Sequence, residues 1–368
     1  MKIIQAGREA LLKPLQAIVG IVERRHTLPI LSNVLVERKS GKLGFIATDL
    51  EVQVTTEIPC NTEGDAISAT VSARKLYEIL RALPDGEKVT IDAGDRKLQI
   101  KTARSKFSLQ TLPAEDFPRL VEASEGANTL TITQRDLKTL LSSVQYAMAQ
   151  QDIRYYLNGM LMIADGDALI AVATDGHRLA LSKLSHNTGA ARREVILPRK
   201  TIIELVKLLD DSDDEVAIAM AEKQVKFRFS DIQLTSKVID GKFPDYTRVI
   251  PAHNKNRIAL SRMELQRALQ RAAILANEKF RGVRLMLSKD QLTIVCSNNE
   301  HEEAQEELVI DYSGEPLDIG FNITYLLDVL NSRSTENMEC ALGDANSSAL
   351  ITEPGNGDFQ YVVMPMRI

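Results

Sequence analysis

Apolar residues recur with helical spacing early in each third of the chain. The three segments that show this spacing are 7–22, 133–149 and 261–277. In the second segment, Leu137, Leu140 and Leu141 follow the i, i+3, i+4 spacing that places side chains on one face of a helix. Leu11, Leu137 and Leu265 lie 126 and 128 residues apart, one in each segment. A period near one third of the chain is typical of tandem domains rather than of short solenoid repeats.

A second helix is predicted later in each third. These segments are 73–83, 198–210 and 321–333. The first two begin alike, with Arg74-Lys75 and Arg199-Lys200, and both stop at turn-forming residues. Each third is therefore expected to contain a pair of helices.

The stretches between the helices alternate apolar and polar residues, which predicts antiparallel strands joined by turns. The clearest alternating runs are 42–58, 88–102, 215–229 and 291–299. A further strand-turn element recurs at 107–118, 234–246 and 361–367. Each third thus reads as helix, strands, helix, strands.

The pattern predicts the α+β class, with three tandem domains at 1–126, 127–254 and 255–368 and two helices packed on antiparallel sheets in each. Polar stretches at 122–128 and 251–256 suit the linkers. The alternative is one large α+β domain in which the repeats are a coincidence.

Composition narrows the class of protein. The 368 residues are 44% hydrophobic and 26% charged, as in a globular protein, with a net charge of −5 and no Trp. The three cysteines, Cys60, Cys296 and Cys340, are scattered and fit a reducing compartment. The sequence shows neither a secretion signal nor an apolar run long enough to span a bilayer. We expect a cytoplasmic protein with no membrane partner.

Charge is unevenly distributed between the predicted helices and the rest of the chain. The six helical segments carry a net charge of +7, which leaves −12 for everything else. Such segregation indicates a polarised surface, in which the helices share one face that meets a polyanion through its phosphates. The alternative is that solvated helix faces simply favour Lys and Arg.

The sequence contains no phosphate-binding loop, dinucleotide fingerprint, metalloprotease motif or nucleophile elbow. The cluster Thr174-Asp175-Gly176-His177-Arg178 is the most catalytic in composition, but an acid–base pair needs mutual hydrogen-bond geometry. The remaining histidines lack ligand spacing, so we expect no metal, no cofactor and no catalytic residue. The acidic stretch 300–307 suits either a solvated strand or a partner for a basic edge.

Several long ungapped motifs resemble the bacterial DNA polymerase III β subunit, or sliding clamp, family. They are ATDGHRLA (173–180), QDIRYYLNGM (151–160), DGKFPDY (240–246), NEKFRGVRL (277–285), YVVMPMR (361–367), TLPILSN (27–33), ATDLE (47–51) and SLQTLPAEDFP (108–118). The resemblance covers the whole chain. It implies a head-to-tail homodimer that forms a six-domain ring, with helices lining the hole and strands on the outside.

By this resemblance, the protein would be a processivity factor rather than an enzyme. The ring would encircle double-stranded DNA without reading its sequence, after loading by the ATP-dependent clamp loader. The lining implied by the resemblance comprises Arg24, Arg25, Arg74, Gln151, Tyr155, Tyr156, Arg199 and Lys200. Weak contacts to phosphates would allow sliding.

The family also has a pocket for short linear peptides. The positions that match it are Arg154, Leu157, Thr174, Gly176, His177, Arg178, Leu179, Pro244, Arg248, Val249, Asn322, Tyr325, Ser348, Val362, Met364, Pro365, Met366 and Arg367. Methionine-rich apolar surfaces adapt to several partners. Without the resemblance, core packing would be the favoured reading of Met364 and Met366. The first third has Leu50 and Glu51 where the second has Gly176 and His177, which implies one pocket per chain.

For dimerisation, the resemblance implies that apolar edge residues of one copy meet a helix end of the other, with charged residues at the rim. The positions are Arg104, Lys106, Phe107, Leu109, Ile274, Leu275 and Glu302. The expected partners are the replicative polymerase α subunit, the clamp loader, translesion and repair polymerases, ligase and mismatch-repair factors. Two other hypotheses are a peptide-binding scaffold that does not support replication, and a nuclease centred on Asp175/His177 or on 300–307.

Overall fold

The computed structural model describes residues 1–22, 28–62, 65–121, 128–189 and 192–368. Within these residues, one order of elements occurs three times: a strand, a helix, four strands, a second helix and three strands. The six helices are α1 (Arg8–Ile18), α2 (Ala73–Ala82), α3 (Gln134–Ser142), α4 (Arg199–Leu208), α5 (Arg262–Ala272) and α6 (Ile323–Ser332). The three-fold repeat predicted from the hydrophobic pattern is confirmed.

The strands of the first repeat are β1 (Lys2–Gly7), β2 (Asn33–Lys39), β3 (Lys42–Thr48), β4 (Val52–Pro59), β5 (Ile67–Ser72), β6 (Lys88–Gly94), β7 (Lys97–Lys101) and β8 (Lys106–Gln110). Those of the second are β9 (Asn128–Thr133), β10 (Gly159–Asp165), β11 (Ala168–Thr174), β12 (Arg178–Ser185), β13 (Arg193–Pro198), β14 (Glu215–Met220), β15 (Gln224–Phe229) and β16 (Ile232–Lys237). Those of the third are β17 (Asn256–Ser261), β18 (Gly282–Ser288), β19 (Gln291–Ser297), β20 (Glu303–Val309), β21 (Leu317–Asn322), β22 (Asn337–Leu342), β23 (Ala349–Glu353) and β24 (Asn356–Val363).

Chain contacts divide the described structure into two compact units. Unit 1 comprises Met1–Arg135 and Ile203–Val238, and unit 2 comprises Asp136–Ile202 and Ile239–Ile368. In unit 1, a four-stranded sheet has the order β1-β6-β7-β8 and an eight-stranded sheet the order β5-β2-β3-β4-β16-β15-β14-β9. In unit 2, the orders are β20-β19-β18-β21 and β13-β10-β11-β12-β24-β23-β22-β17. All pairings are antiparallel, as predicted.

Each eight-stranded sheet is continuous across two repeats. In unit 1, β4 pairs with β16, with Val54 opposite Leu234. In unit 2, β12 pairs with β24, with Ala180 opposite Tyr361. The third strand after the first helix of one repeat thus joins the last strand of the next repeat, and this rule holds at both junctions.

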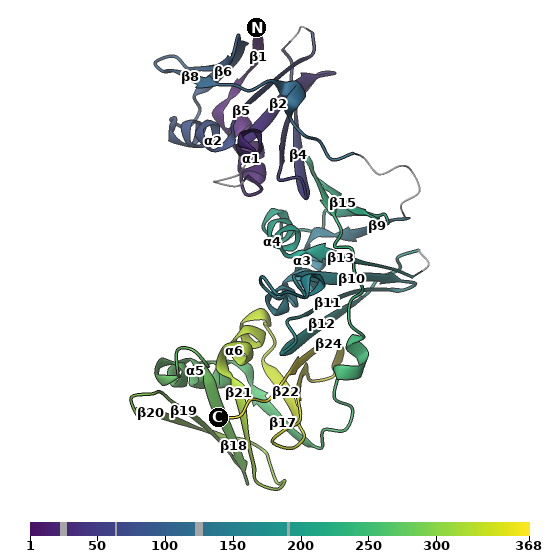
Figure 1. The fold of residues 1–368 in the computed structure, drawn as a ribbon, viewed down its shortest axis with the longest axis vertical. Coiled ribbons are helices and arrows are strands. Elements are labelled where there is room, and N and C mark those ends of the chain that lie inside the picture. Colours follow the sequence, from purple (N-terminus) through teal and green to yellow (C-terminus); the bar gives the residue numbers. More distant parts are fainter. Residues whose placement is uncertain (23–27, 63–64, 122–127, 190–191) are drawn as a thin grey trace. The chain divides into compact units, whose positions relative to one another are not determined.

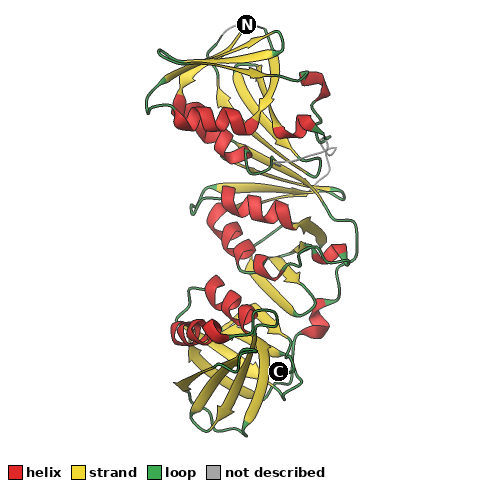
Figure 2. Ribbon diagram, turned by 60° about the vertical axis from the view of Figure 1, so that its left-hand side comes forward, coloured by secondary structure: helices red, strands yellow, loops and turns green. Residues whose placement is uncertain are grey.

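The helices lie against the sheets (Figures 1 and 2), and apolar residues on them are buried. In unit 1, α1 packs against α2 and β4, and in unit 2, α5 packs against α6 and β20. Leu11, Leu137 and Leu265 are all buried, as their equivalent spacing predicted. No helix in the described residues is long and apolar enough to cross a membrane.

The helix ends differ from the sequence-based boundaries. α1 stops at Ile18 rather than 22, shortly before Gly20, where any side chain would collide with the Glu204 carboxylate. α3 stops at Ser142 rather than 149, and the chain continues into a 3-10 turn at Gln145–Ala147. The strand that opens each repeat, β1, β9 or β17, was not predicted from the pattern. Each is only six residues long, which leaves little periodicity to detect.

Candidate functional site

The turn between β11 and β12, residues 174–178, has a backbone held by its own side chains. The Thr174 hydroxyl donates to the Arg178 carbonyl (2.6 Å) and accepts from the Gly176 amide (3.1 Å). The Asp175 carboxylate accepts from the amides of His177 (2.9 Å) and Arg178 (3.0 Å). Thr and Asp side chains satisfy backbone donors in this way in tight turns. The local sequence therefore fixes a loop on which His177 is exposed.

Gly176 combines a backbone conformation that favours glycine with close approach of a neighbouring side chain. Its φ of +89° is left-handed, a region that glycine enters without steric cost. A Cβ at this position would lie 2.8 Å from a guanidinium nitrogen of Arg154. The Arg154 guanidinium thus lies directly over the turn, and it donates to the Asp175 carbonyl (3.2 Å).

Arg154 is oriented by its own loop. The Asp152 carboxylate accepts from Arg154 Nε (3.0 Å), Nη2 (2.9 Å) and backbone amide (2.8 Å). The hydrogen bonds from the Arg154 side chain lower the pKa of Asp152 to about 2. Because this pKa lies below the ordinary 3.8, the interaction is complete above pH 3.8 and is lost only as pH falls through about 2. Asn158 closes the loop with hydrogen bonds to the backbone of Asp152 in both directions (2.9 Å each).

The buried side chain of Arg178 holds the turn against the rest of unit 2. Its side chain is 9% exposed and forms ion pairs with Asp175 (3.0 Å) and Asp328 (2.5 Å). The guanidinium also donates to the Tyr146 carbonyl (2.6 Å) and lies 4.3 Å from the centre of the Tyr325 ring. Its donors are occupied by these partners, so Arg178 supports the turn and does not offer a free charge to a ligand.

A cavity of about 340 Å³ opens beside this turn. Its floor is apolar, because Leu157, Leu179 and Val362 are each nearly fully buried, and Met364 at its rim is 49% exposed. The twelve predicted residues that line it are Arg154, Leu157, Thr174, Gly176, His177, Arg178, Leu179, Pro244, Val249, Ser348, Val362 and Met364. An apolar hollow with a few polar groups at its mouth is suited to the side chains of a short peptide.

Six other residues of the predicted set lie outside the cavity lining: Arg248, Asn322, Tyr325, Pro365, Met366 and Arg367. Arg248 extends into solvent with 84% of its side chain exposed and pairs with Asp245 (2.8 Å). Asn322 caps α6 by accepting from the Thr324 amide. Tyr325 lines a neighbouring polar hollow of about 350 Å³ that also touches His177 and Arg178.

Two lining residues, Asp245 and Tyr246, were not predicted. Asp245 caps the short 3-10 turn Tyr246–Val249 by accepting from the Thr247 amide (3.3 Å) and hydroxyl (2.6 Å). The signal was present in the sequence, since Pro-Asp followed by Thr two residues later is typical of such a turn.

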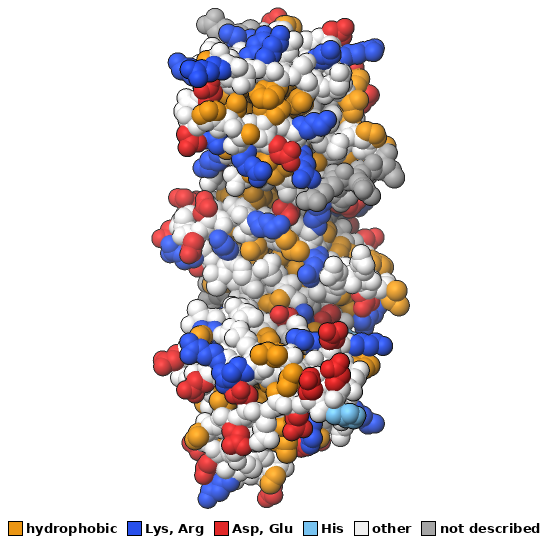
Figure 3. Space-filling model, turned by 90° about the vertical axis from the view of Figure 1, so that its left-hand side faces the viewer, with side chains coloured by type: hydrophobic (Ala, Val, Ile, Leu, Met, Phe, Trp, Pro, Cys, Tyr) orange, Lys and Arg blue, Asp and Glu red, His pale blue; other side chains and the backbone are white. Residues whose placement is uncertain are grey.

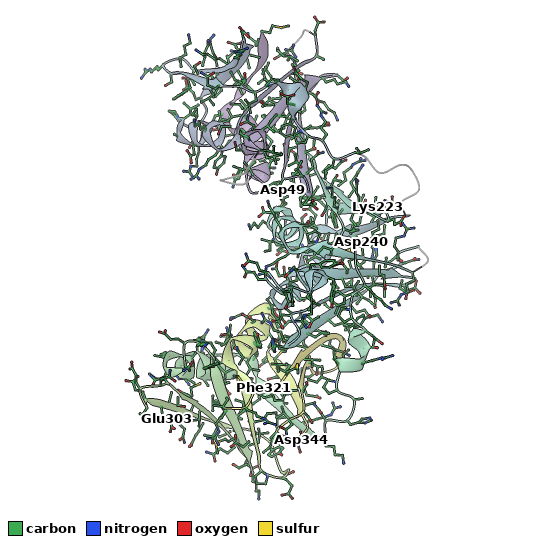
Figure 4. The ribbon with its side chains drawn as sticks, viewed as in Figure 1. Asp49, Lys223, Asp240, Glu303, Phe321 and Asp344 are labelled. Atoms are coloured by element: carbon green, nitrogen blue, oxygen red, sulfur yellow. The ribbon has the colours of Figure 1, made fainter. Side chains whose placement is uncertain are left out.

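The predicted dimer residues lie on two sheet edges or next to them. In unit 1, β8 is an edge strand that carries Lys106, Phe107 and Leu109. In unit 2, β20 is an edge strand with Glu303 at its start (Figure 4) and Glu302 just before it. Ile274 and Leu275 form a 3-10 turn packed against β20, and Ile274 is 78% exposed. Arg104 lies two residues before β8 and is exposed.

The predicted DNA-facing residues are placed as follows. Arg24 and Arg25 lie outside the described residues. Arg74 on α2 is exposed and pairs with Glu78 (2.7 Å). Gln151 has a left-handed φ of +57° and Tyr155 is 57% exposed, whereas Tyr156 packs against the core below β10. Arg199 and Lys200 are half-buried on α4, and Arg199 donates to the Met148 carbonyl (3.0 Å).

The catalytic reading of Asp175 and His177 finds no geometric support. Both oxygens of Asp175 are occupied, by two backbone amides and by Arg178. Among the described residues, no group of three or more His, Cys, Asp or Glu side chains could hold a metal ion.

Comparison with known proteins identifies the family. Three family descriptions match in succession: the DNA polymerase III beta subunit N-terminal domain over 1–121, the central domain over 131–245 and the C-terminal domain over 247–367. The beta sliding clamps of Pseudomonas putida and Escherichia coli K12 are 47% and 42% identical to this chain, each over 98% of both chains. The crystal structure of the DNA polymerase III subunit beta from Pseudomonas aeruginosa is 46% identical and superposes with a TM-score of 0.96 over the full length of both chains. The chain therefore belongs to the DNA polymerase III beta subunit family, the beta sliding clamps, which act in DNA replication as processivity factors and are not themselves enzymes.

Proposed function

We propose that two copies of this chain join head to tail into a closed ring that encircles duplex DNA and holds the replicative polymerase through the cavity beside Gly176. The cavity, the sheet edges and the helix charges each support one part of this proposal.

The strand-pairing rule supports the closed ring. Within the described chain, β4 pairs with the last strand of the second repeat and β12 with the last strand of the third. The strand equivalent to them in the third repeat, β20, and the last strand of the first repeat, β8, are both left at sheet edges. If β20 of one copy pairs with β8 of another, the rule is satisfied at every junction and no edge of this kind remains. This repetition is the observation that carries the proposal.

The two edges are also complementary in chemistry. Lys106 is exposed on β8 and Arg104 just before it, while β20 exposes Glu303 and Glu307. Phe107 and Leu109 on β8 are only partly buried, and Ile274 beside β20 is largely exposed. Apolar contacts of this kind supply most of the free energy of an interface, and the charged rim adds register more than affinity.

The surface charge suits a ring that holds DNA without binding it tightly. On the face drawn in Figure 3, Lys and Arg side chains are interspersed with Asp and Glu and form no unbroken basic patch. Contacts to phosphates carry no sequence information, so a closed ring with a weakly attractive lining slides along any duplex. The proposed lining is the predicted set Arg24, Arg25, Arg74, Gln151, Tyr155, Tyr156, Arg199 and Lys200.

The cavity would take short linear segments of partner proteins. The buried floor of Leu157, Leu179 and Val362 accepts apolar side chains, and Arg154 and His177 stand at the mouth to meet polar groups. The proposed partners are the polymerase α subunit, the clamp loader, translesion and repair polymerases, ligase and mismatch-repair factors, in the bacterial cytoplasm at the replisome. The proposed domain boundaries are 1–126, 127–254 and 255–368.

Retention on circular DNA tests the proposal. The chain is loaded with a clamp loader and ATP onto a nicked circle, and bound protein is separated from free protein by gel filtration at high salt. The ring account predicts retention on the circle and release once a restriction enzyme linearises it. Retention on the linear product at high salt would contradict the account, since topology would then not be what holds the protein.

Assembly is tested separately by light scattering. The native chain is expected to run at twice its 40.8 kDa mass, and Phe107→Asp as a monomer, because a charge would replace an apolar interface side chain. Ser108→Asp on the exposed face of the same strand is the matched control and is expected to remain a dimer. A monomeric native chain at micromolar concentration would contradict the ring.

A further inference from the structure

The same residue type opens the first helix of every repeat. Arg8, Arg135 and Arg262 are spaced 127 residues apart. Arg8 and Arg262 are the first residues of α1 and α5, and Arg135 is the second residue of α3. In the sequence these arginines contribute to the positive charge of the helices, but their contacts assign them another task.

In the first repeat, Arg8 reaches the end of α2. Its Nε donates to the Leu80 carbonyl (2.8 Å) and its Nη2 to the Arg81 carbonyl (3.3 Å). Nη1 forms an ion pair with Asp85 in the turn that follows. The Arg8 backbone amide donates to the Glu87 carbonyl (2.9 Å), and only 12% of the side chain is exposed.

The second repeat has the same arrangement within unit 1. Arg135 donates to the carbonyl of Asp211 (3.3 Å), just beyond α4, and forms ion pairs with Asp211 (3.2 Å) and Asp213 (2.6 Å). Its backbone amide donates to the Ser212 carbonyl (3.0 Å). This side chain is 48% exposed, so it is more open to solvent than that of Arg8.

The third repeat shows it again within unit 2. Arg262 donates to the carbonyl of Leu330 on α6 (3.1 Å) and to that of Thr335 just after α6 (2.8 Å). Its backbone amide donates to the Glu336 carbonyl (2.9 Å). In all three repeats, an arginine at the start of the first helix thus contacts the end of the second helix or the turn after it.

In the first and third repeats the arginine satisfies carbonyls at the end of the second helix, whereas Arg135 binds the acidic turn just beyond α4. The last carbonyls of a helix have no intrahelical partner, and the negative end of the helix dipole favours a cation. Whereas a lysine has three donors on one compact ammonium at the end of a flexible stem, a guanidinium has five donors in a rigid planar fork that reaches groups on two elements at once. These donors are then no longer available to another anion.

We infer that Arg8, Arg135 and Arg262 are positioning residues that tie the two helices of each repeat together, and that phosphate contact falls instead on other cations of the same helices. The candidates are Lys13 on α1, Lys138 on α3 and Arg267 on α5. Lys13 and Arg267 are exposed and Lys138 is half-buried. In the described part of the chain, none of these three has an ion pair. The assignment of phosphate contact to these cations rests on the proposed function. The role of the three arginines in joining the two helices of each repeat does not depend on it.

Matched pairs on one helix test the inference: Arg8 with Lys13, Arg135 with Lys138, and Arg262 with Arg267. Each residue is changed to Ala in the full-length protein. Two quantities are measured: the midpoint of thermal unfolding, and the slope of log K against log salt for a short fluorescein-labelled duplex. Replacing a positioning arginine is expected to lower the midpoint by roughly 4 °C or more and to leave the slope unchanged. Replacing one of the other cations should leave the midpoint unchanged and reduce the slope by about 0.9 for each phosphate that is no longer neutralised.

Arg8→Lys and Arg262→Lys guard against variants that simply fail to fold. If these arginines acted only through their charge on phosphates, lysine would restore the contact. If they join the two helices, lysine cannot replace the planar guanidinium, and the unfolding midpoint is expected to stay low. A reduced slope in the Arg→Ala variants that Lys restores would overturn the inference. Unchanged slopes in all variants, with lowered midpoints for the arginines, would leave the helix tie standing and would instead contradict the helix-face DNA contact of the proposed function.

Discussion

The turns at 48–52 and 174–178 hold the same place in the first and second repeats and have the same backbone. Thr48 donates to the Val52 carbonyl (2.9 Å) as Thr174 does to that of Arg178 (2.6 Å). Asp49, labelled in Figure 4, accepts from the amides of Glu51 and Val52 as Asp175 does from His177 and Arg178. Each turn is also bound in the same way by the end of the last strand of the following repeat. The Lys237 amide donates to the Glu51 carbonyl, and the Met364 amide donates to the His177 carbonyl, each at 2.9 Å.

The two turns differ in the side chains they carry. At the left-handed position, Leu50 has φ +78° where Gly176 has +89°, and only the glycine leaves room for Arg154. Glu51 pairs with Lys237 (3.4 Å), whereas His177 lines a cavity with Met364. The comparison teaches that one repeated backbone can be a plain junction or a binding site, depending on three or four side chains.

Arg178→Ala is expected to have the largest effect, because the second turn depends on this buried guanidinium and the first has Val52 in its place. Removing it leaves Asp175 and Asp328 without their cation, which costs about 3–5 kcal/mol for a buried pair broken on one side. Urea unfolding measures the free energy. Arg154→Ala, at a side chain 46% exposed, is the control and should cost under ~1 kcal/mol. Equal losses for the two variants would show that Arg178 is not the anchor.

Gly176→Leu makes the second turn resemble the first. The new side chain would displace the Arg154 guanidinium and fill the mouth of the cavity. Affinity for a labelled clamp-binding peptide of the polymerase α subunit, measured by fluorescence anisotropy, is expected to fall roughly 100-fold, the loss typical of a binding hot spot. Gly166→Leu also places a leucine at a left-handed φ (+54°), but in open space away from the cavity, and should bind normally. Unchanged binding by Gly176→Leu would remove this turn from the site.

Met364→Ala tests the residue that lies beside the second turn, where Lys237 of the second repeat lies beside the first turn. Loss of a half-exposed methionine at the cavity rim is expected to weaken peptide binding about 10-fold, or ~1.4 kcal/mol. The control is Met263→Ala on α5, a methionine of similar exposure away from the cavity. The same anisotropy titration reports both variants. If both weaken binding equally, the effect does not come from the cavity.

Leu50→Gly is expected to have the smallest effect. Glycine relieves the left-handed strain at φ +78° but gains freedom in the unfolded chain, so the two contributions oppose each other. The unfolding free energy should stay within ~1 kcal/mol of the native chain. No peptide site should arise, because Lys237 remains where a cavity needs an apolar residue. A second binding event in this variant would show that glycine alone makes the site.

Hydrophobic periodicity predicted much of the fold, because helices such as α2 and α5 bury one regular face against a sheet. It could not predict that β4 pairs with β16 or β12 with β24, since strands of different repeats carry no local signal of their partner. It also placed the end of α1 too late, because the apolar pattern continues past Ile18 to Ile21, which is buried although it lies outside the helix.

The site was predictable only in part. Resemblance indicated Gly176, His177 and Met364 at the cavity, but not that Arg178 is occupied by Asp175 and Asp328 or that Arg248 points into solvent. Similarly, a count of helix charges cannot separate Arg8, whose donors are used within the protein, from Lys13, which forms no ion pair with the described residues. Both distinctions depend on three-dimensional partners that lie far away in the sequence.

The stoichiometry of peptide binding tests the central claim, that one of two identical backbones is the site. Isothermal titration of the native chain with the polymerase α subunit peptide is predicted to give one site per chain, and titration of Gly176→Leu to give none at the same concentrations. Two sites per chain, or one site that survives Gly176→Leu, would contradict the account, because the first turn or another surface would then bind the peptide.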